Sequence, residues 1–139
     1  MKYLLDTCVL SEAIKEKPFP AVMRWLDEVN EETCYISSLT VGEIVRGIFK
    51  LNDSKKKNKL INWLEVDLRN RFDTRILDIT REISEQWGKI AATLELDGNT
   101  APVIDCLLAA TAYAHGLILV TRNTKDFLNM PIELFNPWS

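Results

Sequence analysis

The sequence predicts an α/β fold with a central, mainly parallel sheet of four to five short strands flanked by helices. Short apolar runs alternate along the chain with longer segments in which apolar residues recur at helical spacing. This alternation is typical of right-handed β-α-β units, in which a helix connects two parallel strands. A length of 139 residues is enough for one hydrophobic core, so we expect a single domain over residues 1–139.

The chain is expected to begin with a strand at residues 2–5 and a helix at 8–15. That helix must end before Pro18 and Pro20, because a proline cannot continue a helix interior. A second helix is expected at 21–29, where the apolar residues fall on one face.

A β-prone run predicts the second strand at 33–36, and the turn at 37–40 leads into a helix at 41–51. The next segment, about 54–71, reads as one long helix. It begins with closely spaced lysines and carries its apolar residues on one face.

The second half of the chain repeats the alternation. Pro102 suits the first residue of a helix, and Gly116 suits a C-terminal cap. The expected elements are a strand at 75–79, a helix at 80–96, a helix at 102–115, a strand at 117–120, a short helix after the turn at 121–124 and a last strand at 132–135.

Composition excludes several classes of protein. No apolar run approaches the roughly 18 residues that span a bilayer, and the N-terminus lacks the pattern of a signal peptide, so we expect a cytoplasmic protein. Cys8, Cys34 and Cys106 form no C-x-x-C pair and lie far from the single His115, which argues against a disulfide framework and a zinc site. The net charge of −3 argues against phosphate binding over the whole surface, although a local basic patch with a metal can still bind nucleic acid.

Two acids stand near the ends of predicted strands. Asp6 lies where open parallel sheets place site residues, outside the carboxyl end of a strand. It also suits the N-cap of the next helix, so its position alone leaves both interpretations open. Glu43 is similarly ambiguous, because Thr40-Val41-Gly42-Glu43 fits a capping box in which the glutamate reaches back to a backbone N–H.

Asp105 is more informative, because it is the only charged residue between Pro102 and Tyr113. The helix around it is apolar on all sides, which is typical of a buried helix. A helix N-terminus stabilises a carboxylate by roughly 0.3–1 kcal/mol, whereas burying an ion costs several kcal/mol. This imbalance predicts a cation beside Asp105.

Asn123 follows the strand at 117–120 as Asp6 follows the first strand, although asparagine at such a place also serves turns. In a parallel sheet Asp6, Glu43, Asp105 and Asn123 would reach one edge. Two carboxylates about 4 Å apart repel by about 4 kcal/mol at an effective dielectric constant near 20. Carboxylates that share a pocket therefore need protons or a cation, and oxygen ligands alone favour Mg²⁺ or Mn²⁺.

Four segments in this order resemble a PIN-domain ribonuclease: Leu4-Leu5-Asp6-Thr7, Ser37-Ser38-Leu39-Thr40-Val41-Gly42-Glu43-Ile44, residues 104–112 and residues 120–127. The chain is similar, more narrowly, to the VapC/FitB-type toxins of type II toxin–antitoxin pairs, including its closing Phe135-Asn136-Pro137-Trp138. The resemblance covers essentially the whole chain and implies a PIN-like three-layer fold.

The resemblance also implies roles for individual residues. Asp6, Glu43 and Asp105 match the three acids of a divalent-metal site for Mg²⁺ or Mn²⁺, and Asn123 stands where many members have a fourth acid. Asp126, one helical turn later, matches a position outside the acidic set.

Three further positions bear on the same site. Thr7 and Thr121 match hydroxyls that support it, and Cys8 stands where asparagine is more usual. We expect that cysteine to change local hydrogen bonding and to leave the chemistry intact.

The implied activity is metal-dependent endonucleolytic cleavage of RNA. A metal-activated water would attack the phosphodiester in line and expel the 3′ oxygen of the preceding nucleotide. The implied partners are the RNA substrate, a cognate antitoxin that blocks the acidic pocket, and a second copy in a homodimer or in a higher-order complex with the antitoxin.

Basic residues are candidates for holding the RNA backbone. Arg46 lies one helical turn after Glu43, and Lys55, Lys56 and Lys57 belong to the densest positive run, which also suits a solvated helix start.

Because an amide at position 123 adds no charge, a catalytically inactive PIN-like module that binds RNA or protein is the alternative. A haloacid-dehalogenase-like phosphatase would need an acid where Cys8 stands.

Overall fold

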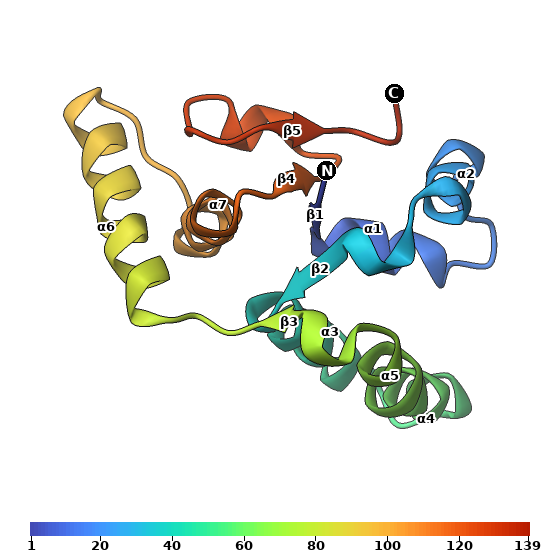
Figure 1. Ribbon diagram of the computed structural model, residues 1–139. Coiled ribbons are helices and arrows are strands. Elements are labelled where there is room, and N and C mark those ends of the chain that lie inside the picture. The colour runs from blue at the N-terminus through green and yellow to red at the C-terminus, as the bar shows by residue number, and fades with distance from the viewer.

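The protein has a three-layer architecture in its computed structural model, which describes all residues from Met1 to Ser139 (Figure 1). The middle layer is one sheet with the strand order β3-β2-β1-β4-β5, in which every neighbouring pair is parallel. The strands are β1 (Tyr3–Leu5), β2 (Cys34–Ser37), β3 (Ile76–Leu77), β4 (Ile118–Val120) and β5 (Leu134–Phe135). The predicted parallel α/β fold is therefore confirmed.

Helices cover both faces of the sheet (Figure 1). One layer contains α1 (Thr7–Ala13), α2 (Pro20–Glu28), α3 (Ser38–Phe49), α4 (Lys55–Asn62) and α5 (Arg69–Phe72). The other contains α6 (Arg81–Leu96) and α7 (Val103–His115). None of the helices has both the length and the apolar content needed to cross a membrane.

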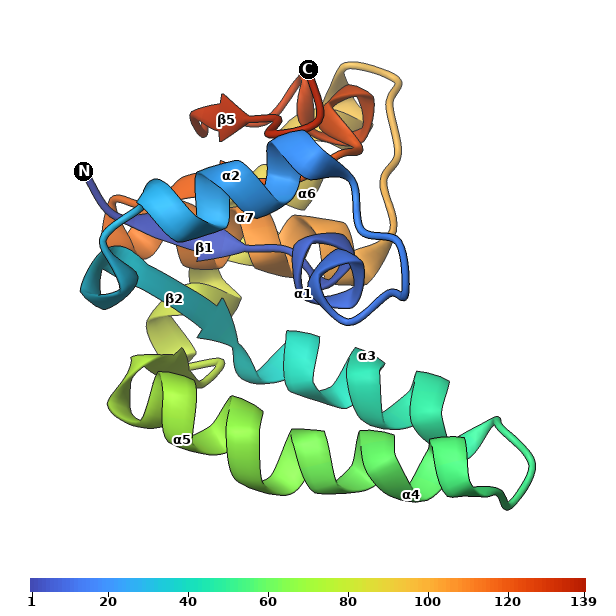
Figure 2. The same ribbon diagram turned by 90° about the vertical axis from the view of Figure 1, so that its right-hand side faces the viewer.

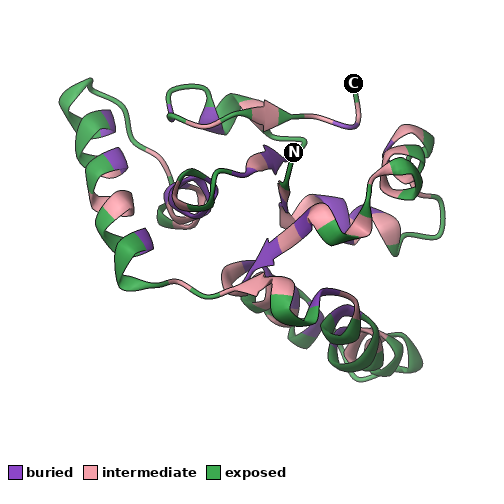
Figure 3. Cartoon of the chain, viewed as in Figure 1, coloured by how far each residue is buried: buried purple, intermediate pink, exposed green.

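The strands divide the hydrophobic core into two parts. Leu4 and Leu119 pack with α6 and α7, whereas their neighbours Leu5 and Val120 pack with the helices of the other layer. Successive side chains of a strand point to opposite faces, so a fully apolar strand can serve two cores. Figure 3 shows the corresponding buried positions on the strands and on the sheet-facing sides of the helices.

The parallel arrangement brings all carboxyl ends of the strands to one edge. α1 and α3 begin directly after β1 and β2. α7 precedes β4 and is separated from it only by Gly116 and Leu117, so its first turn lies at the same edge. Gly116 adopts a left-handed conformation with φ 64°, as expected for the C-terminal cap of a helix that turns back into a strand.

One predicted helix start is wrong, and the correction affects a site residue. α3 begins at Ser38, because the hydroxyl of Ser37 accepts the N–H of Leu39 (3.0 Å) and caps the helix. Thr40 is therefore not an N-cap, and the capping box with Glu43 does not form. Glu43 lies in the second helical turn, where its side chain is available to the site.

The segment expected as one helix over 54–71 is helical throughout, but its middle, Trp63–Leu68, is a wider π-helical stretch between α4 and α5. Leu64, Leu68 and Phe72 bury one face of this segment at a spacing of four residues. Figure 2 shows α3 lying alongside α4, while the α5 end of the segment lies below β2.

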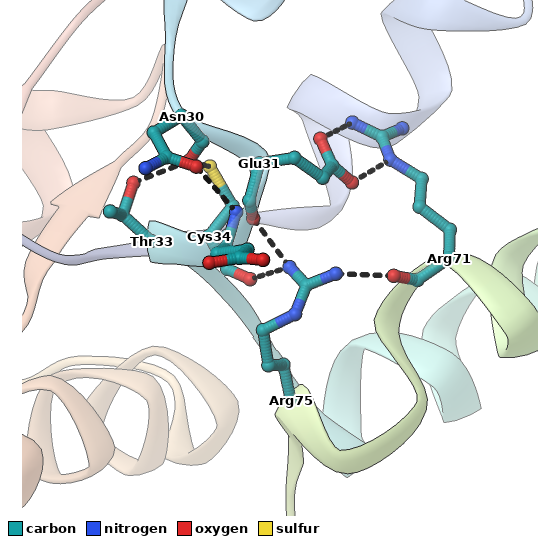
Figure 4. Close-up of polar contacts among 7 residues, drawn as sticks. Asn30, Glu31, Thr33, Cys34, Arg71 and Arg75 are labelled. Atoms are coloured by element: carbon teal, nitrogen blue, oxygen red, sulfur yellow. Dashed lines mark hydrogen bonds and ion pairs between the residues drawn. The ribbon is translucent and has the colours of Figure 1, made fainter.

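An arginine cluster joins the end of α5 to the start of β2 (Figure 4). The guanidinium group of Arg75 donates to the carbonyl oxygens of Glu31, Cys34 and Arg71. Arg71 forms an ion pair with the carboxylate of Glu31. Asp73, between the two arginines, has a positive φ of 39° and ends α5 shortly before β3.

Candidate active site

Asp6 lies at the carboxyl end of the central strand and caps α1. Its Oδ1 accepts the N–H of Thr7 (2.8 Å), and its Oδ2 accepts the hydroxyl of Thr121 (2.8 Å). Its own N–H donates to the carbonyl of Val120 (3.0 Å), which joins the ends of β1 and β4. Asp6 can therefore be both the N-cap of α1 and a site residue, because one carboxylate oxygen caps the helix and the other contacts Thr121 after β4.

Thr121 is fully buried and connects three parts of this edge. Besides donating to Asp6, its hydroxyl accepts the N–H of Asn123 (3.1 Å). Cys8 lies against the same pair, with its Sγ 3.8 Å from Thr121 Oγ1 and 3.9 Å from Asp6 Oδ2. Burial raises the pKa of the Cys8 thiol, the N–H of Arg122 lowers it, and the charge of Asp6 raises it further. The net effect is upward, so the thiol is neutral.

Glu43 reaches the site through Thr7. The Thr7 hydroxyl donates to Glu43 Oε1 (2.8 Å), while the Thr7 N–H donates to Asp6. One residue therefore orients both acids, and Glu43 Oε2 keeps no donor within the chain. The contacts place both predicted hydroxyls, Thr7 and Thr121, on the acids of the candidate site.

Asp105 lies in the first turn of α7, half-buried, and its carboxylate accepts no hydrogen bond and forms no ion pair. Burial raises the pKa of Asp105, and the negative charges of Asp126, Asp6 and Glu43 raise it further, in that order. The structure thus brings Asp105 into the electrostatic field of the two other predicted acids.

Asp126 is the acid that sequence reasoning placed outside the set. It lies in a 3₁₀ turn, Thr124–Phe127, and of the three nearby carboxylates it raises the pKa of Asp105 the most. The one sequence feature that pointed to Asp126 is its position one helical turn after Asn123, which follows a strand end. Asn123 itself is exposed, and its side-chain amide forms no hydrogen bond.

Carboxylate oxygens suit a hard cation such as Mg²⁺, but the acidic side chains do not converge on one point. As the side chains stand, no group of three His, Cys, Asp or Glu side chains is placed to hold a metal ion. No lysine or arginine pairs with Asp6, Glu43 or Asp105, since all ion pairs of the chain lie elsewhere. The negative charges of Asp6 and Glu43 therefore act on Asp105 without a paired lysine or arginine to offset them.

The predicted RNA-binding residues lie on α3 and at the start of α4. Arg46 is exposed on α3, and Lys57 forms an ion pair with Asp53 and lies over the ring of Phe49. Figure 2 shows that α4, which begins at Lys55, starts at the end of α3 far from β2.

Comparison with known proteins decides the family. The family model of the PIN domain matches residues 3–132. The chain belongs to the PIN-domain family. Within it, the chain is 36% identical over 135 residues to Toxin FitB of Neisseria gonorrhoeae, covering 97% of each chain. It is 33% identical to VapC ribonuclease Y4jK of Sinorhizobium fredii, covering 97% of this chain and 96% of that one.

Solved structures agree with the family. The crystal structure of FitAcB from Neisseria gonorrhoeae superposes with a TM-score of 0.94 at 35% identity and covers 98% of both chains. VapBC2 from Rickettsia felis, bound to a DNA fragment from their promoter, gives a TM-score of 0.79 at 28% identity and also covers 98% of both. The predicted PIN-like three-layer fold and the resemblance to VapC/FitB-type toxins are confirmed.

Proposed function

We propose that this PIN-domain chain is a metal-dependent endoribonuclease and the toxin of a type II toxin–antitoxin pair, acting in the cytoplasm as a single domain. The names of its relatives, a toxin and a ribonuclease, support this proposal because the matches span nearly the whole of both chains. The observation that carries it is the position of Asp105, a half-buried carboxylate without a hydrogen bond in the field of three other acids. A bound cation would stabilise such a carboxylate more than one that already accepts hydrogen bonds.

Asp6, Glu43 and Asp105 would hold Mg²⁺ or Mn²⁺. A bound ion of this kind polarises a phosphoryl oxygen and lowers the pKa of a water molecule. Asn123 would add a neutral amide at the rim, and Asp126 would supply the fourth carboxylate that position 123 lacks.

The chain's own residues orient these ligands. Thr121 and the Thr7 N–H fix both oxygens of Asp6, and the Thr7 hydroxyl fixes one oxygen of Glu43. Such outer-shell partners typically contribute 10–100-fold to metal affinity or activity. In the proposed reaction a water oxygen bonds to phosphorus, and the 3′ oxygen of the preceding nucleotide leaves with a proton from solvent.

The proposed partners are RNA, a cognate antitoxin and a second copy of the chain. The two-component FitAcB and VapBC2 structures support a protein partner of this kind. An inactive binding module is the second candidate, favoured by the amide at position 123 in place of a fourth acid.

Cleavage of total bacterial RNA in Mn²⁺ tests the proposal. We expect cleavage by the purified chain, its loss in EDTA, and a fall of more than about 100-fold in Asp6→Asn and Asp105→Asn, because a ligand matters more than its supporting partners. Asp27→Asn, an exposed change on α2, serves as the matched control. Equal rates in all four proteins would refute the assignment, and absence of both cleavage and growth arrest on expression would favour the inactive module.

A further inference from the structure

We propose that Arg122 binds a phosphate of the RNA beside the acidic edge, and that Trp138 holds the Arg122 side chain in place for this contact. The inference rests on the proposed function. It gives the RNA a cation on the residue next to Thr121, which donates to Asp6, whereas the lysines of α4 begin at the far end of α3 (Figure 2).

Arg122 is placed at the site by its backbone. It lies between Thr121, which donates to Asp6, and Asn123, whose N–H donates to Thr121. The N–H of Thr121 is in turn fixed on the carbonyl of Phe135 (3.0 Å). The Arg122 side chain is exposed and forms no hydrogen bond or ion pair within the chain, so all five guanidinium N–H donors are available.

Trp138 restrains that free side chain. The guanidinium carbon of Arg122 lies 5.6 Å from the centre of the Trp138 ring, within the range of a cation–π contact. The tail carrying Trp138 is fixed too, because the Trp138 N–H donates to Asn136 Oδ1 (2.9 Å) and Phe135 pairs with Val120 in the sheet. Stacking of this kind leaves the edges of the guanidinium group free for a phosphate.

Glu12 fixes the indole from the other side. The Trp138 Nε1–H donates to Glu12 Oε1 (3.3 Å), and the same carboxylate accepts from Lys15 Nζ (3.1 Å) and from the N–H of Phe19 (3.2 Å). Glu12 is only 4% exposed. Burial raises its pKa, but these donors and the charge of Lys15 outweigh burial and lower it, so Glu12 stays ionised.

The contacts close a ring that starts and ends at the acidic edge. Asp6 caps α1, α1 carries Glu12, Glu12 holds Trp138, Trp138 underlies Arg122, and Arg122 is bonded to Thr121. The C-terminal tail is thereby tied to the candidate active site. A cation held in place next to Thr121 would offset the repulsion between the acids and the RNA backbone.

Steady-state cleavage of a purified bacterial tRNA pool in Mn²⁺ tests the inference. We expect Arg122→Ala to raise KM on the order of tenfold with little change in kcat, since a backbone contact acts mainly on binding. The slope of log(kcat/KM) against log[salt] should become shallower by about 0.7, the value for one phosphate contact on a single strand. Arg81→Ala makes the same charge change on the exposed start of α6 and should match the wild type.

Trp138→Leu should raise KM by a smaller factor, and the double variant should be no worse than Arg122→Ala, because a positioning residue acts through its partner. If Trp138→Leu raised KM by the same factor in the Arg122→Ala background as in the wild type, the positioning role of Trp138 would be overturned. If Trp138→Leu does not fold, Arg122→Ala still decides the phosphate contact.

The outcomes separate this inference from the proposed function. No cleavage by the wild type would contradict the ribonuclease assignment. Cleavage with identical KM values and salt slopes in Arg122→Ala and Arg81→Ala would overturn the inference alone.

Discussion

Two threonine hydroxyls determine how the acids of the candidate site are presented. Thr121 donates to Asp6 across a sequence separation of 115 residues, and Thr7 donates to Glu43 across 36. A hydrogen bond to a charged group contributes roughly 1.5–3 kcal/mol to stability, more than one between neutral groups. These hydroxyls therefore connect the stability of the sheet edge to the geometry of the site.

Thr121→Val should impair both properties, because valine keeps the shape of threonine but cannot donate to Asp6. We expect the free energy of unfolding in urea to fall by about 1.5–3 kcal/mol and RNA cleavage to fall by about 10–100-fold. Thr111→Val is the matched control, since the buried Thr111 hydroxyl donates to the carbonyl of Leu107 inside α7. Activity losses of the same size in both variants would show that the Asp6 contact is unimportant.

Asp105 should destabilise the protein when no metal is bound. Burial and the charges of Asp126, Asp6 and Glu43 raise its pKa in the folded state, so the folded protein binds this proton more tightly than the unfolded chain. Stability consequently falls as the pH rises from the ordinary carboxyl pKa of 3.8 through the folded-state value.

Asp105→Asn should therefore raise the melting temperature in EDTA at pH 7. The difference from the wild type should disappear at pH values below 3.8, where Asp105 is protonated in both states. Thermal unfolding monitored by circular dichroism measures this effect. A lower melting temperature for Asp105→Asn at pH 7 would mean that the carboxylate is satisfied by the chain itself.

At the scale of elements, the layer formed by α3, α4 and α5 carries Glu43, and the arginine cluster attaches it to the sheet (Figure 4). Arg75 donates to the carbonyl of Cys34, the first residue of β2, to that of Glu31 in the turn before it, and to that of Arg71. Lysine has a single terminal nitrogen, so it cannot reproduce the spread of donors by which the planar guanidinium group reaches these carbonyl groups.

Arg75→Lys should lower the free energy of unfolding in urea by about 1–3 kcal/mol, because at least one buried carbonyl loses its donor. Cleavage activity of the folded fraction should be unchanged, since the cluster lies away from the acids. Arg81→Lys, on the exposed start of α6, should leave stability within about 0.5 kcal/mol of the wild type. Equal stability of the two variants would show that the cluster does not hold the layer.

The elements could be predicted from apolar periodicity, but their ends depend on contacts that periodicity does not contain. Ser37 and Thr40 are both suitable N-caps, and the sequence pattern also fitted a capping box between Thr40 and Glu43. The structure uses Ser37 because β2 ends there and the helix follows at once. The π-helical stretch Trp63–Leu68 carries no glycine or proline to mark it, so the expected segment showed no interruption.

At the scale of the whole molecule, the parallel sheet brings together acids that are far apart in the chain. Asp6, Glu43 and Asp105 could be proposed from strand ends and one isolated charge, because topology sends these positions to a common edge. Asp126 could not, since its effect on Asp105 depends on how the turn Thr124–Phe127 lies against the first turn of α7.

The contacts of the C-terminal tail were also beyond sequence reasoning. The resemblance included Trp138, but its hydrogen bond to Glu12 joins residues 126 positions apart. Tertiary packing of the tail against α1 creates that contact, and no local pattern in either segment indicates it.

Titration with Mn²⁺ by isothermal calorimetry tests the central claim, which is that Asp6, Glu43 and Asp105 share one ion. We expect saturable binding by the wild type and by Asp27→Asn, and loss of that binding in Asp6→Asn, Glu43→Gln and Asp105→Asn, each checked for folding by circular dichroism. Binding to Glu43→Gln and Asp105→Asn with wild-type affinity would show that the three carboxylates do not form a common metal site.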